Sequence, residues 1–300
     1  MKRTVALLAV ATLTAILSAC GSSNPLAGDG SGERDDGTVV IGSADFAESE
    51  LIMEIYAQAL RAAGIEVRTQ PRLGSREVTN RALQDGSLGV MPEYSGNLLQ
   101  SVDPAATTTA TTSDEVYTVL RQALPEGLEV LEQSEAQNRD VLVVTRQTSE
   151  RFELTSMDQL GPRCGQFVLG AAGEWPGRWQ DRIAELYGCT FQQIIATDVG
   201  GPVTLESLRS GQAQVVNLFT TSPDIRANNW VELDDPKQMY PAQNILPLMR
   251  AGVLQQAGVD ALNEVSAALT TETLVDYNRR ITEERAVPAD LAKEFVAELR

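Results

Sequence analysis

The sequence predicts an α/β protein whose two lobes each hold a mostly parallel β-sheet flanked by helices. Short segments that read as strands, at 38–43, 65–70 and 88–92, alternate with segments of helical periodicity. The same alternation returns between residues 140 and 220, and residues 258–300 show helical periodicity throughout. Such alternation is typical of parallel sheets whose crossover helices cover their faces. With 300 residues, 43% of them hydrophobic, the chain is long enough for two such lobes.

The first lobe is expected to open with a strand at 38–43 and a helix at 45–64. Asp45 and Glu48 have the spacing of a capping box, and Gly64 suits the position just after a helix. The elements that should follow are a strand at 65–70, a helix at 74–86, a strand at 88–92 and helices at 93–102 and 115–124.

The second lobe is expected to begin with a strand at 140–146 and a short capped helix at 155–161. The next elements should be strands at 165–170, 190–196 and 213–220, with helices at 179–188 and 202–211 between them. A strand at 244–250 and helices at 258–269, 272–284 and 288–299 complete the prediction. In open α/β sheets, ligands bind at the carboxyl ends of the strands.

The first 37 residues indicate export and anchoring. Lys2 and Arg3 precede an apolar run, and Leu-Ser-Ala-Cys at 17–20 is the pattern that lipoprotein processing uses. We therefore expect a signal peptide at 1–19, a lipidated Cys20, and a flexible tether at 20–37 on the outer face of the cell membrane. The alternative is an ordinary signal peptide cut near Ala19. No later apolar stretch is long enough to predict a transmembrane helix.

Two further cysteines, Cys164 and Cys189, precede the predicted strands at 165–170 and 190–196. The starts of two strands in a βαβ unit can be neighbours, and export favours oxidation, so we expect a disulfide between them. The alternative is a pair of buried free thiols. A thiol nucleophile is the least favoured interpretation, because no histidine is present to activate it.

The composition disfavours several classes of partner and of catalytic site. The formal charge of -17 disfavours nucleic acid and anionic lipid as partners and suits cationic or zwitterionic solutes. The absence of histidine removes the commonest general base and most zinc sites. Carboxylate pairs such as Asp45/Glu48 or Asp234/Asp235 lack the rest of an active site. We therefore expect no enzyme, metal site or cofactor, although the composition alone does not exclude an enzyme.

Three strand-to-helix junctions carry a resemblance to a known family. They read IGSADFAESELI (41–52), LGSREVTNRALQDGSLGVMPEYSG (73–96) and VVNLFTTSPDI (215–225). Together they resemble the osmoprotectant-binding proteins of ABC importers, which bind glycine betaine, choline, carnitine and related compounds. The resemblance covers Val39 to Leu299, and its most specific part is Pro-Glu-Tyr-Ser-Gly at 92–96.

The resemblance implies a type II periplasmic-binding fold, in which two lobes joined by two crossings close on the ligand. Lobe 1 would comprise 38–139 and 244–300, and lobe 2 would comprise 140–243. It also implies a monomer that is lipid-tethered to the membrane and delivers solute to an ABC permease with its ATPase. The alternatives are the same role with a different polar or aromatic solute, or a receptor or scaffold derived from a binding protein.

The family's aromatic cages hold quaternary ammonium groups through cation–π attraction. By resemblance, Tyr94 matches a cage tyrosine, and Asp140 stands where the family tends to have another. Trp175 and Trp179, four residues apart, could supply a missing wall or pack in the core. The candidate ligand-binding residues are Phe46, Glu48, Ser49, Gly74, Ser75, Tyr94, Ser95, Asn138, Asp140, Glu174, Trp175, Trp179, Phe219, Thr220 and Thr221.

Each candidate also has a purely structural interpretation. Tyr94 and Phe46 could pack at helix starts, and Glu48 could cap a helix. Asp140 could pair with an arginine across the hinge. Gly74 and Ser75 could simply form the turn, although a turn before a helix is also a natural seat for an anion.

Overall fold

The computed structural model describes residues 37–74, 76–106 and 109–300. The predicted signal peptide at 1–19, Cys20, the tether up to residue 36, and Ser75 lie outside the described residues. The sections below concern the described part of the chain.

The lobe 1 sheet has the strand order β2-β1-β3-β10-β4. β1 pairs in parallel with β2 and β3, whereas β10 runs antiparallel to both β3 and β4. The strands are β1 (Val39–Gly42), β2 (Val67–Gln70), β3 (Val90–Tyr94), β4 (Leu128–Val130) and β10 (Ile245–Arg250).

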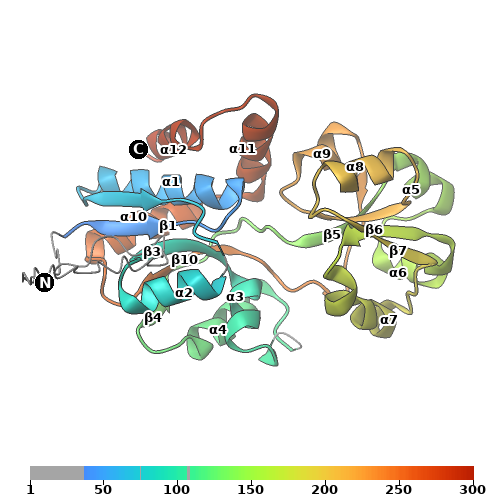
Figure 1. The fold of residues 1–300 in the computed structure, drawn as a ribbon, viewed down its shortest axis with the longest axis horizontal. Coiled ribbons are helices and arrows are strands. Elements are labelled where there is room, and N and C mark those ends of the chain that lie inside the picture. Colours follow the sequence, from blue (N-terminus) through green and yellow to red (C-terminus); the bar gives the residue numbers. More distant parts are fainter. Residues whose placement is uncertain (1–36, 75, 107–108) are drawn as a thin grey trace, which may run out of the picture. The chain divides into compact units, whose positions relative to one another are not determined.

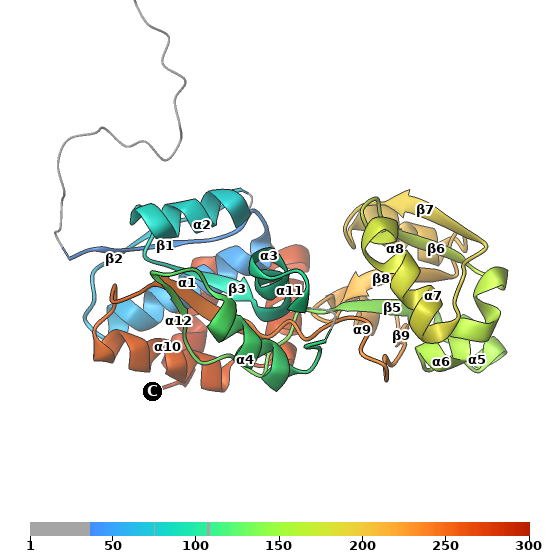
Figure 2. The same ribbon diagram turned by 90° about the horizontal axis from the view of Figure 1, so that it is seen from below.

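Helices cover both faces of this sheet. α2 lies on one face, and α1, α10 and α12 lie on the other (Figure 2). The helices of this lobe are α1 (Ala47–Ala62), α2 (Arg76–Asp85), α3 (Ser95–Val102), α4 (Ser113–Ala123), α10 (Gln256–Ala268), α11 (Thr271–Glu283) and α12 (Pro288–Glu298).

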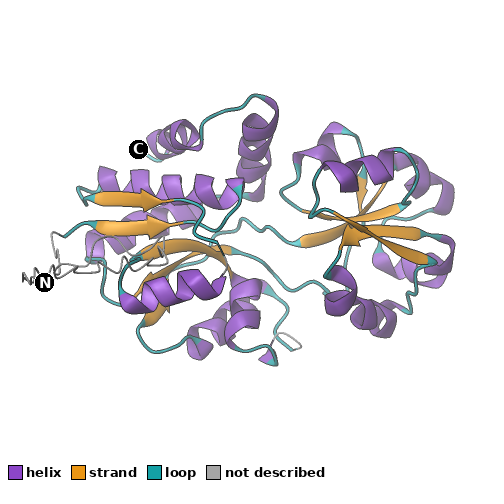
Figure 3. Cartoon of the chain, in the orientation of Figure 1, coloured by secondary structure: helices purple, strands orange, loops and turns teal. Residues whose placement is uncertain are grey.

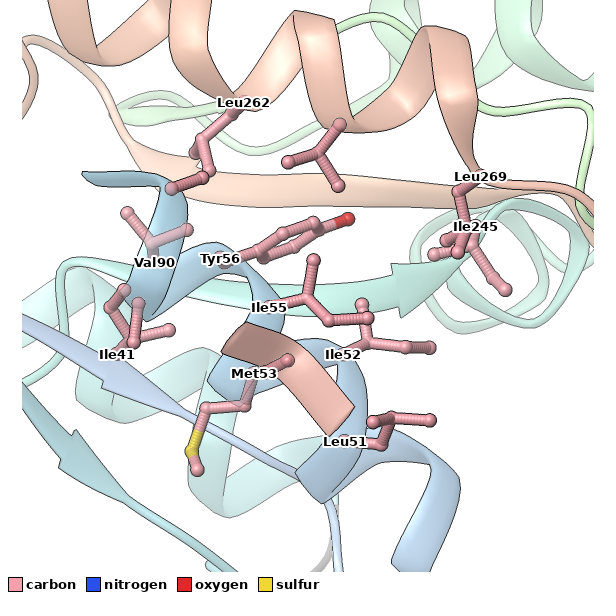
Figure 4. Packing of buried hydrophobic residues seen from close by; sticks show 14 of the residues in the cluster. Ile41, Leu51, Ile52, Met53, Ile55, Tyr56, Val90, Ile245, Leu262 and Leu269 are labelled. Atoms are coloured by element: carbon pink, nitrogen blue, oxygen red, sulfur yellow. The ribbon is translucent and has the colours of Figure 1, made fainter. Parts of the chain in front are cut away.

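The core of lobe 1 lies beneath α1. Ile52, Ile55 and Tyr56 of this helix are buried against strand residues such as Ile41, Val90 and Ile245 and against Leu262 of α10 (Figure 4). Burying each large apolar side chain contributes roughly 1.5–3 kcal/mol. This packing holds the first turn of α1, where several site residues lie, in a fixed position against the sheet.

The lobe 2 sheet has the order β7-β6-β8-β5-β9. β6 pairs in parallel with β7 and β8, and β5 runs antiparallel to β8 and β9. The strands are β5 (Asp140–Val144), β6 (Val168–Ala172), β7 (Gln193–Thr197), β8 (Val215–Phe219) and β9 (Val231–Glu232).

Two separate apolar clusters line the two faces of the lobe 2 sheet. One lies under α8 and α9, and the other lies under α6 and α7 (Figure 1). The helical segments are α5 (Arg146–Phe152), α6 (Met157–Leu160), the 3₁₀ turn Gly161–Gln166, the π-helical turn Pro176–Gln180, α7 (Asp181–Tyr187), α8 (Pro202–Arg209) and α9 (Pro223–Ala227).

Two connecting segments join the sheets, one between β4 and β5 and one between β9 and β10 (Figure 3). They pair with each other through an antiparallel bridge between Gln137 and Asn244, and Asn138 N donates to Gln243 O at 3.1 Å. β5 follows the first segment and β10 follows the second. Each is an internal strand of its sheet and runs antiparallel to both of its neighbours. The predicted two-lobed α/β fold is therefore confirmed, with both sheets mixed.

Cys164 and Cys189 form the disulfide expected from their positions, with their Cα atoms 5.2 Å apart. The parallel pairing of β6 with β7 begins where Val168 lies opposite Gln193. Each cysteine lies just upstream of its strand, so both sit at the same end of the pair.

Several local predictions were wrong. α1 is preceded by Phe46 with no side-chain cap, so Asp45 and Glu48 do not form a capping box. The carboxylate of Glu48 is engaged by distant residues instead. Glu93 and Tyr94 belong to β3 and not to the following helix. The short elements β4, β9, α5 and α9 were not predicted, because few residues in each show a clear hydrophobic period.

Candidate solute-binding site

Glu48, in the first turn of α1, is the centre of a buried polar cluster. Its side chain is only 5% exposed, and three groups donate to it. Asn138 Nδ2 and Tyr94 OH lie 2.7 and 2.9 Å from Oε1, and Asn278 Nδ2 lies 2.6 Å from Oε2. These donors and the start of the helix stabilise a carboxylate that burial alone would destabilise. We call Glu48, Tyr94, Asn138 and Asn278 the Glu48 cluster.

Tyr94 ends β3 and is 6% exposed. Burial raises the pKa of its phenol well above the ordinary value, and the adjacent Glu48 charge raises it further. The hydroxyl therefore stays protonated and donates to Glu48. The Phe46 ring lies 5.8 Å from the Tyr94 ring, centroid to centroid, and is 41% exposed. Phe46 is the solvent-facing member of this aromatic pair.

Three of the candidate hydroxyl groups hold the backbone. Ser95 Oγ donates to Ala242 O at 3.3 Å and accepts from Asn244 N at 3.0 Å. Thr220 Oγ1 donates to Gln137 O at 2.9 Å and accepts from Arg139 N at 3.0 Å. Ser95 thus hydrogen-bonds to the connecting segment between β9 and β10, and Thr220 hydrogen-bonds to the segment between β4 and β5.

The third of these hydroxyls is local to lobe 1, since Ser49 Oγ accepts from Ala44 N at 3.0 Å. Thr221 is buried, and its carbonyl accepts from Asn278 Nδ2 at 3.3 Å. Phe219 lies opposite Asp140 in the pairing of β8 with β5. Gly74 lies in an exposed turn before α2 and has a φ of +95°, a conformation that favours glycine.

Asp140 begins β5 in a partly buried position near lobe 2 groups of both charges. Burial raises the pKa of its carboxyl, and the nearby exposed Glu174 adds to this effect. Arg178 and a hydrogen bond from Asn217 act in the opposite direction. Tyr240 is buried, and burial together with the Asp140 charge raises the pKa of its phenol.

Trp175 and Trp179 belong to the apolar core of lobe 2. Trp175 Nε1 donates to Tyr240 OH at 3.0 Å, and the Trp179 and Tyr240 rings meet edge to face at 5.0 Å. Trp175 and Trp179 are 2% and 7% exposed, values similar to the 6% of Tyr94. Both rings pack in the core of lobe 2, and a contact of either ring with a solute stays a prediction.

Sequence reasoning missed Asn278, Tyr240 and the pair formed by Arg76 and Glu93. Arg76 Nε and Nη2 lie 2.8 and 2.9 Å from the two carboxylate oxygens of the buried Glu93. Asn278 lies in α11, where neither its spacing nor its neighbours indicates a contact with Glu48. The one usable signal was Glu93, a charged residue at the end of an otherwise apolar strand.

In the described part of the chain, no group of three or more Asp, Glu or Cys residues is arranged to hold a metal ion. None of the described helices is both long and apolar enough to cross a membrane.

The fold is that of the two-lobed solute-binding proteins. Residues 37–298 match the family described as the substrate binding domain of the ABC-type glycine betaine transport system, and the chain belongs to this family. It is therefore an extracytoplasmic binding component of an importer and not an enzyme.

Similar proteins span nearly the whole chain. A glycine-betaine-binding protein of Pseudomonas aeruginosa is 24% identical, over 87% of this chain and 88% of its own. The glycine betaine-binding protein YehZ of Escherichia coli is 26% identical, over 85% of this chain and 90% of its own. The crystal structure of a glycine betaine/carnitine/choline ABC transporter has a TM-score of 0.76 at 19% identity, covering 87% of this chain and 98% of that one.

Proposed function

We propose that this protein captures glycine betaine or a related quaternary-ammonium osmoprotectant between its lobes and delivers it to an ABC permease and ATPase. Family membership and the relatives named for glycine betaine support this ligand class. Closure about the two connecting segments, with lobe 1 at 38–139 and 244–300 and lobe 2 at 140–243, is the proposed capture step.

The observation that carries the proposal is the Phe46–Tyr94 pair beside the Glu48 carboxylate. A quaternary ammonium has no proton to donate, so aromatic faces and negative charge are the groups that attract it. Each ring contributes ~0.5–2 kcal/mol by cation–π attraction. Because the Tyr94 hydroxyl donates a hydrogen bond to the Glu48 carboxylate, its ring is richer in electrons than that of a free phenol. The exposed Phe46 gives the solute its first surface.

Asp140 supplies the complement from lobe 2. Burial disfavours its negative charge, as the raised pKa of its carboxyl reflects, so a bound cation would stabilise the ionised form. The Asp140 carboxylate attracts an ammonium group by its charge, as an aromatic ring does by its quadrupole. The exposed Glu174 adds negative charge nearby. We assign the ammonium to Phe46, Tyr94 and Asp140, and leave Trp175 and Trp179 in the core.

The polar end of the solute requires hydrogen-bonding groups. Asn138 Oδ1 is buried without a hydrogen-bond partner among the described residues, while its amide nitrogen is held by Glu48. It is therefore an acceptor suited to a hydroxyl such as that of choline or carnitine. For a carboxylate-bearing solute, the turn formed by Gly74 and Ser75 before α2 is the proposed seat.

The leader and anchor form a separate part of the proposal. We assign residues 1–19 as a signal peptide and Cys20 as the lipidated first residue of a tethered monomer. Intact mass measurement of the membrane-extracted protein tests this assignment. A diacylated N-terminal Cys20 supports it, and an unmodified chain beginning near residue 20 contradicts it.

The ligand class is tested by thermal unfolding of the protein with glycine betaine, choline, carnitine, free amino acids and aromatic metabolites. A ligand at 100 times its Kd stabilises by ~2.7 kcal/mol, which raises Tm by several degrees. Stabilisation by a quaternary amine should be lost in Tyr94→Ala and largely kept in Tyr94→Phe, which retains the ring. Val287→Ala, at an exposed position, is the matched control. Stabilisation by an aromatic metabolite alone would show that the ligand is not a betaine.

A further inference from the structure

A cavity of about 670 Å³ lies beside the first connecting segment. None of Phe46, Glu48, Tyr94 and Asp140 lines it. Its walls come from that segment, from the loop after β8, from α9 and β9, and from the start of α11. It therefore has contributions from both sheet-containing lobes, and Thr220 is the only described candidate solute-binding residue that lines it.

Positive charge predominates in this cavity, although the protein as a whole carries -17. Three arginines line it, Arg139, Arg146 and Arg226, against two carboxylates, Glu232 and Glu272. Lysine and arginine together number 24 in the chain, so three around one cavity is a local concentration. Such a concave, basic surface attracts anions.

The arginine side chains are available. Within the part of the chain that the structure describes, the Arg139 and Arg226 guanidinium groups make no hydrogen bond or ion pair, and Arg146 donates only to Asn229 Oδ1 at 3.3 Å. Arg139 is also partly buried. A partly buried guanidinium with five donors and no protein acceptor is poised to bind an incoming acceptor.

Glu232 is one of the two carboxylates that line the cavity, and its charge interacts with two of the three arginines. Burial raises the pKa of its carboxyl, while Arg139 and Arg226 both act to lower it. Neither Glu232 nor Glu272 forms an ion pair with these arginines, and two carboxylates against three guanidinium groups leave one positive charge unmatched. The Ser222 hydroxyl on the wall provides a neutral donor.

We propose that this cavity binds a multivalent anion bearing phosphate or carboxylate groups. Arginine suits both, because its planar fork donates two parallel hydrogen bonds to such oxygens. Arg139 is the inner ligand, Arg226 and Arg146 close the rim, and Ser222 donates from the wall. The site is independent of the solute site and is testable without any solute present.

The experiment measures Tm of the intact protein against inorganic phosphate and, separately, citrate. Potassium chloride keeps the ionic strength constant. The variants are Arg139→Gln and Arg226→Gln, with Arg81→Gln as the control because Arg81 is exposed on α2, away from the cavity. Tm in chloride alone shows that each variant is folded. Arg226→Gln removes no hydrogen bond or ion pair within the described protein, so it tests binding even if Arg139→Gln destabilises the fold.

The proposal predicts a saturable rise in Tm with phosphate or citrate for the wild type and for Arg81→Gln. Arg226→Gln should weaken the apparent affinity at least 5-fold, and Arg139→Gln should abolish the saturable effect. A wild-type response that is absent or follows ionic strength alone would overturn the proposal. So would equal responses in Arg81→Gln and Arg226→Gln. Neither outcome depends on whether the protein binds a quaternary amine.

Discussion

Glu48 and Asn278 lie 230 positions apart in the sequence, and Asn278 Nδ2 donates to Glu48 Oε2 at 2.6 Å. The same amide nitrogen lies 3.3 Å from the carbonyl oxygen of Thr221, in the loop after β8 of lobe 2. Asn138, in the first connecting segment, donates to the other carboxylate oxygen. One buried side chain thus joins α1, α11 and the connecting segment beside the proposed solute site.

Glu48→Gln should destabilise the protein by about 2–3 kcal/mol in urea unfolding, because it removes a charged acceptor from a buried cluster. Glutamine has one acceptor oxygen for three donors, and its amide nitrogen must face at least one of them. The control is Glu54→Gln in the same helix, because the Glu54 side chain makes no hydrogen bond to the other described residues. This change should cost under about 0.5 kcal/mol. Equal urea midpoints for the two variants would contradict the role assigned to Glu48.

Asp140→Asn should stabilise the empty protein, and more so as pH rises. Burial raises the pKa of the Asp140 carboxyl in the folded state above its ordinary value of 3.8. The folded state therefore binds this proton more tightly than the unfolded state, and stability falls as pH rises from about that value through the raised pKa. The uncharged amide of Asp140→Asn does not lose stability in this way as pH rises. Urea unfolding from pH 4 upward should show a growing difference, and Asp114→Asn, at an exposed position, should not.

Reducing the Cys164–Cys189 bond should lower stability by ~3 kcal/mol in the chain-entropy account, given a sequence separation of 25. Tm measured with and without dithiothreitol tests this. A Cys164→Ala/Cys189→Ala variant should start from the lower Tm and show no further effect of reductant. A wild-type Tm that is insensitive to full reduction, verified by thiol titration, would argue against a stabilising bond.

Gly96→Ala should be strongly destabilising, although the change adds one methyl group. A Cβ at this position would lie 2.5 Å from the carbonyl oxygen of Ala242, in the segment that returns to lobe 1. Relief requires moving α3 or that segment, so we expect a loss of about 1–3 kcal/mol. Gly173→Ala is the matched control, since nothing lies within 4 Å of its added Cβ. Similar unfolding midpoints for both variants would refute close packing here.

The long periodic segments were predictable because local hydrophobic patterns specify them. α1, α11 and the strands around Ile41 and Val216 carry their apolar face in the sequence itself. The antiparallel placement of β5 and β10 has no local signature, because a buried strand reads the same in either direction. Short edge elements such as β9 have too few residues to show a period.

The site was only partly predictable, for a related reason. The residues around Tyr94 stood out through their resemblance to a known motif, but their partners are set by tertiary contacts. Nothing near Asn278 in the sequence indicates that it meets Glu48, and the spacing of Asp45 and Glu48 favoured a cap that does not form. Trp175 and Trp179 share a helical face, and only packing decides whether that face meets core or solvent.

The central claim is that a positive charge, and not only a bulky apolar group, is recognised at Phe46 and Tyr94. Titration calorimetry should compare glycine betaine with 3,3-dimethylbutanoate, and choline with 3,3-dimethylbutan-1-ol, pairs that differ by nitrogen against carbon at the same shape. We predict that the charged member of at least one pair binds and that its neutral-headed partner binds at least 10-fold more weakly, with binding lost in Tyr94→Ala. Equal affinity of both members of each pair, or no binding of either charged solute, would contradict the account.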